Sequence, residues 1–404
     1  MRTRLLFVDD EPLVLQGLRR ALYAMREEWD MSFVESGPAA LEVLAQDRYD
    51  VIITDMRMPG MDGAELLDEV KRRHPDMLRI ILSGQSSREA VLRSISPSHQ
   101  YLTKPCDVKE LKQRLNEAFS MRDLLANQKL KTLVSSLKSI PSVPTLYEEL
   151  LHELRGEDPS AARIGAVISK DIGMTAKILQ LANSAFLGLR CHISSPTQAV
   201  GMIGMDMVRA LVLSVDVFSR LEGRFEVGHY WMALWEHSVM VASFAQRITA
   251  SENSSKAIVD ESFTAGLLHD VGRVLLLAEM PEYVEILDEA AGKPGSLSTL
   301  EHARLGCTHS DVGAYLMGVW GLPHAVLQAV AFHDRPRQST QKQFSSLTSV
   351  HAADAFAGAL APSIVTEDGG VDMEYLTGLG LSDRAPAWRQ ACEEFLESSK
   401  RNAP

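Results

Sequence analysis

The sequence predicts two domains of different fold class: an N-terminal α/β domain with a doubly wound parallel sheet, and a C-terminal all-α domain. Short apolar segments alternate with helical patterns over the first 120 residues, which is typical of a parallel sheet covered on both faces. The strand signal ends after Phe119, and helical patterns follow. The length of 404 residues suits two domains of roughly 150 residues or more each.

The N-terminal elements follow from the apolar pattern. The strands are short and apolar, as expected for strands that are buried on both sides. They are expected at residues 5–8, 32–34, 51–54, 80–82 and 101–102. The helices between them repeat their apolar residues every three to four positions. They are expected at residues 14–25, 39–46, 64–73, 88–95 and 108–119. Residues 1–120 therefore form the first predicted domain.

A helical segment at residues 121–138 is expected to link the domains, because two prolines end the pattern directly after it, at Pro141 and Pro144. One apolar stripe runs along it at helical spacing: Leu130, Leu133, Val134 and Leu137. The stripe has two interpretations. It pairs with a second copy of the chain, which makes a homodimer, or it packs on the chain's own helical domain.

The helical domain is expected at residues 139–361, where capping signals and apolar periodicity recur without strands. Residues 362–404 are expected to be a C-terminal tail. Within this tail, glycine-rich residues 369–380 are expected to be a loop, and one further helix is expected near residues 387–397.

Composition limits the class of protein. The net charge of −12 opposes non-specific binding to phosphate backbones, so no nucleic-acid partner is expected. The apolar run at residues 5–8 is too short for a signal peptide or a membrane span, so no membrane partner is expected either. Four scattered cysteines without a CxxC pair indicate a reduced, cytoplasmic protein.

Polar side chains follow the predicted strands where these strands end. Asp9 and Asp10 follow the first strand, and Asp55 follows the third; Ser83 and Lys104 follow the last two. Ligands of open α/β sheets bind at these strand ends. Carboxylates gathered there would repel one another without a hard cation such as Mg²⁺. With a serine hydroxyl and a lysine amine beside the cation, the site is suited to carry a phosphoryl group on an aspartate.

These motifs resemble those of response-regulator receiver domains, which have a flavodoxin-like (βα)5 fold. The matching segments are Val8-Asp9-Asp10-Glu11, Thr54-Asp55-Met56-Arg57-Met58-Pro59-Gly60, Leu82-Ser83-Gly84 and Tyr101-Leu102-Thr103-Lys104-Pro105. The resemblance implies that a histidine kinase phosphorylates Asp55. It implies Mg²⁺ on Asp9, Asp10, Asp55 and the backbone carbonyl of Arg57. It also implies phosphoryl contacts from Ser83 and Lys104, with Tyr101 as the aromatic switch.

A second set of polar residues lies in the helical domain. His237, His269-Asp270 and Asp354 supply nitrogen and carboxylate ligands from different helices, as helical bundles do for Mn²⁺, Fe²⁺ or Zn²⁺. A possible second metal site takes its ligands from His309, His333 and Asp334. The other histidines of this region, His302, His324 and His351, are expected to be structural.

The order H…HD…D resembles the HD phosphohydrolase superfamily, and residues 135–345 resemble its HDOD branch more closely. The segments that carry this second resemblance are Ile140-Pro141-Ser142-Val143-Pro144, Ile168-Ser169-Lys170-Asp171, Leu181-Ala182-Asn183-Ser184-Ala185-Phe186, Gly266-Leu267-Leu268-His269-Asp270 and Trp320-Gly321-Leu322-Pro323. HDOD domains are output modules that generally act through protein contacts. The pattern departs from cyclic-di-GMP-hydrolysing relatives at Asp334, at Arg335-Pro336-Arg337 and at Arg273, where those relatives carry histidine, a Gly-Tyr-Pro element and lysine.

The sequence thus predicts a two-component response regulator whose receiver controls a helical HDOD output domain that acts on an unknown downstream protein. The alternative is a receiver-regulated, metal-dependent phosphohydrolase of the HD superfamily. A DNA-binding regulator is disfavoured, because the chain is acidic and has no clear helix-turn-helix with a basic recognition helix.

Overall fold

The computed structural model describes most of the chain, and the account below is restricted to that part. The described residues are 2–83, 98–104, 109, 111–116, 128–137, 141–142, 144–155, 159–183, 193–205, 208, 212, 219–220, 228–291, 297–364 and 370–401. The helix expected at residues 88–95 and the first part of the expected linker helix, residues 121–127, lie outside them.

The N-terminal domain is a five-stranded parallel sheet in the order β2-β1-β3-β4-β5. This order confirms the doubly wound fold, since the chain moves outward from β1 in both directions. The strands are β1 (Thr3–Val8), β2 (Trp29–Val34), β3 (Val51–Asp55), β4 (Leu78–Ser83) and β5 (Gln100–Thr103). The described helices and the 3₁₀ turn are α1 (Pro12–Ala21), η1 (Tyr23–Met25), α2 (Gly37–Gln46) and α3 (Gly63–Arg73).

Alternate residues of each strand face opposite layers of helices. On one face, Leu6 and Ile52 pack with Ala40 of α2 and Leu66 of α3. On the other face, side chains of β1, β3, β4 and β5 join an apolar cluster that continues without a break into the helical domain. The two domains therefore share one core along this face of the sheet.

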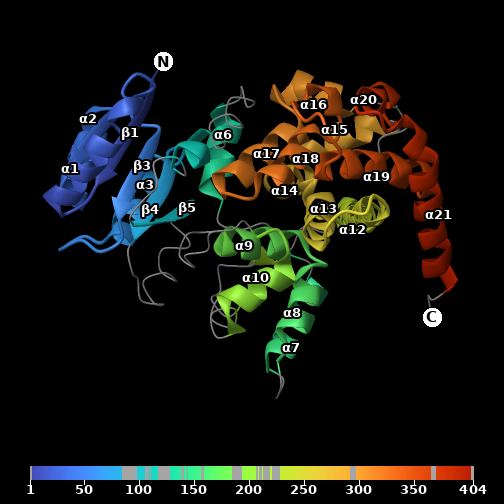
Figure 1. Ribbon diagram of the computed structural model, residues 1–404. Helices are drawn as coiled ribbons and strands as arrows, with labels where there is room; N and C mark the ends of the chain where they lie inside the picture. The colour runs from blue at the N-terminus through green and yellow to red at the C-terminus, as the bar shows by residue number, and fades with distance from the viewer. Residues whose placement is uncertain are drawn as a thin grey trace.

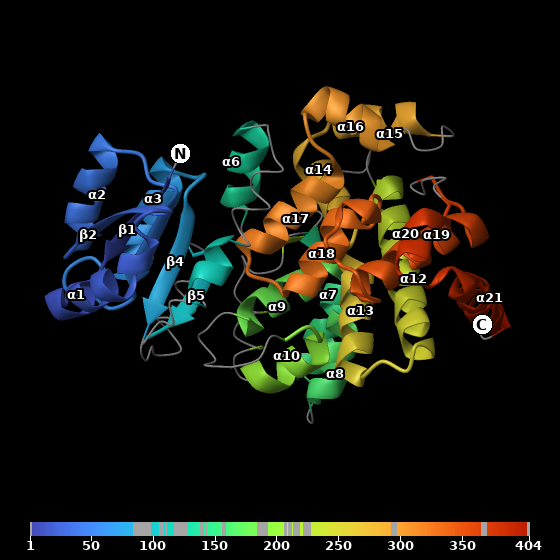
Figure 2. The ribbon, with the colours of Figure 1, turned by 45° about the horizontal axis from the view of Figure 1, so that its top comes forward.

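The linking helix α6 (Gln128–Ser136) ends close to its expected end. Leu130 and Val134 are buried in the shared core, and Leu133 and Leu137 pack against it. This arrangement favours the second interpretation of the apolar stripe, packing within the chain. Figures 1 and 2 both show α6 and α17 (His309–Val319) between the sheet and the remaining helices.

Beyond β5, the regular elements that the structure describes are helices, apart from β6 (Pro141–Ser142) and β7 (Ser219–Arg220), which pair in parallel. Its first described helices are α7 (Pro144–Arg155), α8 (Ala161–Ile168), α9 (Ile172–Ala182) and α10 (Pro196–Ile203). The central helices are α12 (Gly228–Ser251), α13 (Lys256–Leu268), α14 (Val271–Glu279), α15 (Tyr283–Ala290), α16 (Leu297–Leu305), α18 (His324–Phe332) and α19 (Ser346–Leu360), with the short turn η4 (Pro336–Gln338).

The expected tail belongs to the folded domain. Residues 369–380 are not only a loop, because α20 (Met373–Gly378) lies within them and is capped by the Asp372 side chain. After η5 (Ser382–Arg384), the expected last helix is present as α21 (Ala385–Arg401). Trp388 and Cys392 of α21 are fully buried in the shared core.

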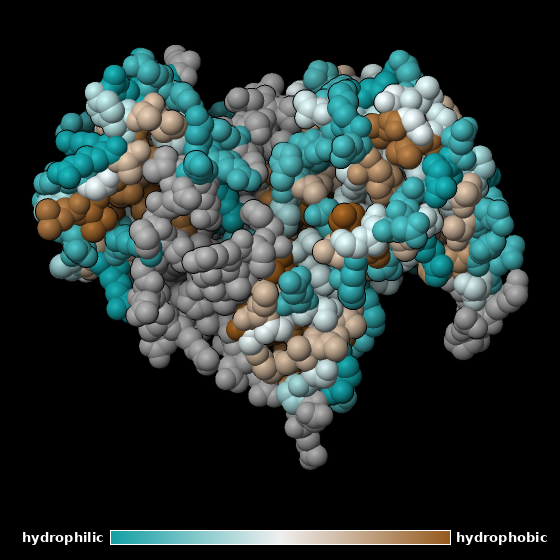
Figure 3. All heavy atoms as spheres, viewed as in Figure 1, coloured by the Kyte–Doolittle hydropathy of each residue, from teal (hydrophilic) through white to brown (hydrophobic). Residues whose placement is uncertain are grey.

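Two surface features bear on partners. No helix within the described ranges is long and apolar enough to cross a membrane. Figure 3 shows hydrophobic atoms over α1 at the edge of the N-terminal domain, where the Leu13 side chain is 78% exposed.

Candidate functional site

Strand pairing brings the N-terminal acidic residues together. Val8 of β1 lies opposite Thr54 of β3, so the following residues, Asp9 and Asp55, lie side by side at the carboxyl edge of the sheet. Both carboxylates are buried, at 2% and 8% exposure. Asp10 is only partly buried.

Lys104 connects these carboxylates. It follows the last residue of β5, and its Nζ lies 2.5 Å from Asp9 Oδ2 and forms an ion pair with Asp55. Burial raises the pKa of Asp55, and Lys104 acts against that rise. Burial opposes the charge of Lys104 too, yet its bonds to Asp55 and Asp9 keep its pKa above the ordinary value. A cation in this place stabilises the negative charge of the site.

Backbone amides hold the carboxylates in orientation. Glu11 N–H donates to Asp9 Oδ1 at 3.1 Å, and Arg57 N–H donates to Asp55 Oδ2 at 2.6 Å. Ser83 is the last residue of β4, and Tyr101 lies in β5. The side chains of Ser83 and Tyr101 lie outside the part of the chain that the structure describes. The oxygen donors of Asp9, Asp10 and Asp55 suit Mg²⁺, which prefers such hard ligands.

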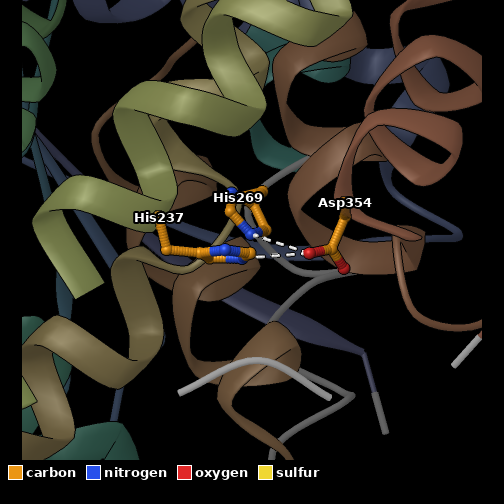
Figure 4. Close-up of side chains that lie close together, drawn as sticks. All are labelled: His237, His269 and Asp354. Carbon is orange, nitrogen blue, oxygen red and sulfur yellow. Dashed lines mark ion pairs between the residues drawn. The ribbon is translucent and has the colours of Figure 1, made fainter. Parts of the chain in front are cut away.

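The predicted ligands of the helical domain converge from several helices. His237 lies within α12, His269 caps the end of α13, and Asp354 lies within α19. His237 Nε2 is 3.0 Å from Asp354 Oδ1, and His269 Nε2 is 3.8 Å from the same oxygen (Figure 4). One nitrogen or oxygen atom from each residue lies within 4.8 Å of the other two, which is close enough for one metal ion.

A second group shares His269 with the first. His269, Asp270 and His333 also bring one ligand atom each within 4.8 Å of the others. His309, the first residue of α17, points Nε2 at Asp270 Oδ1 from 3.3 Å. We call His237, His269, Asp270, His309, His333 and Asp354 together the HD cluster.

The protonation of the imidazoles favours a cation in the cluster. The Nδ1 atoms of His269 and His333 face the carbonyl oxygens of Gly266 and Val330, at 2.7 and 3.0 Å. A carbonyl only accepts, so Nδ1 carries the proton and Nε2 offers its lone pair in the neutral ring. This is the arrangement of metal-bound histidines, in which the outer nitrogen is fixed by an acceptor.

Several inward-facing atoms have no hydrogen-bond partner among the described residues. These buried atoms are His269 Nε2, His309 Nε2 and Asp270 Oδ1. A buried polar atom without a partner is costly, and a metal ion would satisfy the lone pairs of His269 Nε2 and Asp270 Oδ1 directly. Burial lowers the pKa of His269 to about 4, so its ring is neutral and able to bind a metal at neutral pH. The cluster therefore fits a transition metal such as Mn²⁺, Fe²⁺ or Zn²⁺.

Two residues of this site were not predicted from the sequence. Glu301 of α16 is fully buried and accepts from His309 Nδ1 at 2.8 Å and from the His309 backbone N–H at 3.0 Å. Tyr283 O–H donates to the same carboxylate. Burial opposes the charge of His309, but Glu301 raises its pKa to about 9, so a proton or another cation is favoured between His309 and Asp270. Glu301 stands in an ordinary helical pattern, with no sequence signal.

Four residues singled out in the sequence have other contacts. The carboxylate of Asp334 accepts from Ser298 Oγ at 3.3 Å, and Arg335 pairs with Asp311. The guanidinium of Arg273 lies 3.3 Å from Asp270. His351 uses both ring nitrogens, since Nδ1 donates to the His333 carbonyl and Nε2 accepts from the Asp372 N–H. This accords with the structural role expected for His351.

Comparison with known proteins agrees with the fold and with the sequence motifs. The response regulator receiver domain model matches residues 5–116, and the HDOD domain model matches residues 140–336. Together these matches cover most of the chain. The fold and the acidic site at the sheet edge are those of response regulators. The chain belongs to this family, as a member with a receiver domain followed by an HDOD domain.

Individual relatives match parts of the chain. It is 36% identical over 114 residues to the DNA-binding transcriptional regulator NtrC of Escherichia coli (strain K12), which is 28% of this chain and 24% of NtrC. It is 27% identical over 206 residues to an uncharacterized protein of Treponema pallidum (strain Nichols), which is 50% of this chain and 39% of that protein. The chain thus spans less than half the length of these curated relatives.

Solved structures are similar to parts of the chain. The MmoQ response regulator from Methylococcus capsulatus str. Bath is 29% identical, with 62% of this chain and 97% of that chain covered and a TM-score of 0.48. A response regulator receiver domain protein from Clostridium thermocellum is 30% identical, with 30% of this chain and 98% of that chain covered and a TM-score of 0.28.

Proposed function

We propose that this protein is a cytoplasmic phosphorylation switch in which a histidine kinase phosphorylates Asp55 and thereby controls the helical HDOD domain. The supporting observation is Lys104, which bonds to Asp9 and Asp55 at once and so holds a cation beside the acceptor carboxylate. The exposed Leu13 on α1, three residues after Asp10, offers an apolar contact for the kinase.

The chemistry follows from this arrangement. An Asp55 carboxylate oxygen attacks the donor phosphorus, the new P–O bond forms, and the bond from phosphorus to the donor breaks. When bound by Asp9, Asp10, Asp55 and the Arg57 carbonyl, Mg²⁺ supplies positive charge that balances the phosphoryl oxygens. Lys104 then gives up its bond with Asp55 and bonds to the phosphoryl group. The Ser83 hydroxyl bonds to the same group, and the Tyr101 side chain shifts. The phosphoryl group adds a charge of about −2, so the receiver switches between a state without this charge and a state with it.

For the output domain we propose metal binding by the HD cluster, without turnover of cyclic-di-GMP, and signalling through contacts with a downstream protein. Hydrolysis needs an open metal position for water and groups that clamp the phosphate. Arg273 instead lies against Asp270, and Asp334 bonds to Ser298. A bound metal here would join α12, α13, α17, α18 and α19 and hold the output surface in shape.

Phosphotransfer is tested by incubating the protein with acetyl phosphate and Mg²⁺ and measuring the intact mass. We expect one phosphoryl group on the wild type and none on Asp55→Asn, because acetate leaves only when Asp55 attacks. The control is Asp62→Asn, which changes the partly buried N-cap aspartate of α3, a residue outside the expected phosphoryl and Mg²⁺ sites. Equal labelling of Asp55→Asn and wild type would contradict the assignment.

Metal binding is tested on the same preparations by elemental analysis after loading with Mn²⁺ or Zn²⁺. We expect bound metal in the wild type and in His302→Ala, whose exposed histidine is not one of the six residues of the cluster, and a loss in His269→Ala. An assay against cyclic-di-GMP and simple phosphoesters follows. Turnover that His269→Ala abolishes would support the rival function, a receiver-regulated phosphohydrolase, in place of a non-catalytic module.

A further inference from the structure

Helix α17 reaches from the HD cluster to the receiver. Its first residue, His309, lies against Asp270, and its last residue is Val319. Eleven residues of α-helix span about 16 Å, so one rigid element reaches from the HD cluster to the contacts with the receiver. Both ends are held by buried polar contacts, and the middle is held by a third.

At its C-terminal end, receiver side chains bind the helix carbonyls. Gln100 of β5 donates from Nε2 to the carbonyls of Gly318 at 3.0 Å and Val319 at 3.1 Å. Arg114, in the described helical residues 111–116, donates from Nη1 to the Gly321 carbonyl at 2.9 Å. The last carbonyls of a helix lack partners within the helix and attract positive charge. The receiver thus adds side-chain donors to the carbonyls at the C-terminal end of α17.

The middle of α17 is held through the linking helix. Arg79 Nη2 and His99 Nε2 both donate to the Ser135 carbonyl in α6, at 2.8 and 2.7 Å. The Ser135 hydroxyl is 2.8 Å from the Tyr315 hydroxyl of α17. These groups are buried, so breaking the chain of hydrogen bonds would leave unsatisfied polar atoms.

The N-terminal end of α17 has no room to move independently. A Cβ atom on Gly272 of α14 would lie 1.9 Å from the His309 carbonyl oxygen, so the two helices touch through their backbones. Asp270 is the N-cap of α14, next to this contact. A displacement of α17 is therefore passed on to α14, and it moves His309 and Asp270 relative to His237 of α12 and Asp354 of α19.

We infer that α17 couples the receiver to the HD cluster: phosphorylation of Asp55 changes the affinity of the cluster for a divalent transition metal, and Gln100 and Arg114 act as positioning residues. The inference rests on the proposed function. Lys104 follows β5 directly, and Gln100 begins that strand. When Lys104 leaves Asp55 for a phosphoryl group, β5 is displaced at one end and its contact with α17 at the other. By linkage, metal in the cluster changes the phosphorylation equilibrium by the same factor.

The experiment measures Zn²⁺ affinity of the full chain by competition with a chromophoric chelator, with Mg²⁺ in excess to fill the receiver site. Each protein is titrated with and without beryllium fluoride, which imitates the phosphoryl group on Asp55. The His269→Ala variant lacks one ligand of the HD cluster, so it measures Zn²⁺ binding elsewhere on the chain. We expect beryllium fluoride to change the wild-type affinity about fivefold or more, within the usual range of coupling between sites.

The variants separate coupling from simple loss of a contact. Gln100→Ala and Arg114→Lys should bind Zn²⁺ with affinities that no longer depend on beryllium fluoride. The matched control is Gln128→Ala, which removes an exposed hydrogen bond from α6 to Asp76 of the receiver and leaves the bonds of Gln100 and Arg114 at the end of α17 in place. This control should keep the full dependence.

The outcomes distinguish the two proposals. If wild type binds both beryllium fluoride and Zn²⁺ but shows one Zn²⁺ affinity, the coupling is wrong and the proposed function stands. If Gln128→Ala loses the dependence as Gln100→Ala does, transmission through α17 is wrong. If Zn²⁺ or beryllium fluoride does not bind at all, the proposed function fails, and the coupling fails with it.

Discussion

His99 illustrates how a single residue is tied to the junction between the domains. Its Nδ1 accepts from the Arg79 backbone N–H at 3.1 Å, while its Nε2 donates to the Ser135 carbonyl. Only the neutral ring with its proton on Nε2 makes both bonds. Burial lowers the pKa of His99 well below 6.5, and the charge of Arg79 acts in the same direction.

A dependence of stability on pH follows from this environment. As the pH falls below about 6.5, the unfolded chain binds a proton on His99 and the folded chain does not, so unfolding is favoured by up to about 1.4 kcal/mol per pH unit. We expect His99→Asn to reduce this loss, because its amide oxygen accepts from Arg79 and does not titrate. The measurement is urea unfolding of both proteins at pH 7 and pH 5.5.

Burial also lowers the pKa of His269 and His351, so these residues contribute to the loss of stability too. Both residues are present in both proteins, so the difference between the two losses of stability is due to His99. If the free energy of unfolding falls by the same amount in His99→Asn and in wild type, protonation of His99 on unfolding is not the cause of the fall, and this prediction is wrong.

At the scale of elements, close backbone contact between α14 and α17 is what brings Asp270 and His309 together. Gly272 allows that contact, since any Cβ there would strike the His309 carbonyl. Gly201 of α10 is a matched case without such a contact, because a Cβ there meets nothing within 4 Å. Both glycines lie in helices, so the intrinsic effect of alanine on the helix is the same.

These two glycines give opposite expectations. Gly272→Ala should lower the free energy of unfolding by about 1–3 kcal/mol or more, because α14 and α17 must separate. Gly201→Ala should raise it by about 0.5–1 kcal/mol, because alanine favours the helix. Chemical denaturation of both variants checks this pair. An unchanged stability of Gly272→Ala would mean that α17 is free to shift.

The elements also show what the sequence could predict. The strands were predicted from their short apolar runs. The convergence of Asp9 and Asp55 was predicted because the carboxyl ends of parallel strands lie at one edge of the sheet. The helix α20 was missed because its six residues end at a glycine within a glycine-rich stretch, which hides the Asp372 cap. A helical period shows which face of α6 is apolar, but it does not show what covers that face.

At the scale of the whole molecule, long-range pairs were beyond prediction. Gln100 and Arg114 bond to backbone carbonyls more than 200 residues away, and a carbonyl carries no sequence signal. Glu301 was missed because it stands in an ordinary helical pattern, and nothing in the sequence marks it as the partner of His309. The HD cluster was predicted in outline because its ligand types, unlike its geometry, are visible in the order of residues.

The folded domain extends beyond residues 140–336, which the HDOD model matches. Trp388 is fully buried, donates from Nε1 to Glu252 at 2.8 Å and packs beside Phe344. We expect Trp388→Ala to lower the free energy of unfolding by about 3–5 kcal/mol, since it empties a large core position. The exposed Ser398→Ala on the same helix should change it little. Thermal or urea unfolding distinguishes them. If Trp388→Ala and Ser398→Ala were equally stable, α21 would not contribute to the stability of the domain.

The separation in sequence between Gln100 and Gly318 has a consequence for the newly made protein. The receiver leaves the ribosome first, and the carbonyls that Gln100 binds follow 218 residues later. At about 5–20 residues per second, this leaves about 10–45 s in which the receiver side of the junction faces water. If a histidine kinase phosphorylates Asp55 as proposed, a nascent receiver that folds in that time can meet the kinase before it has an output domain. We therefore expect a fraction of molecules to complete their synthesis already phosphorylated, with the output domain docking onto a receiver whose state is set.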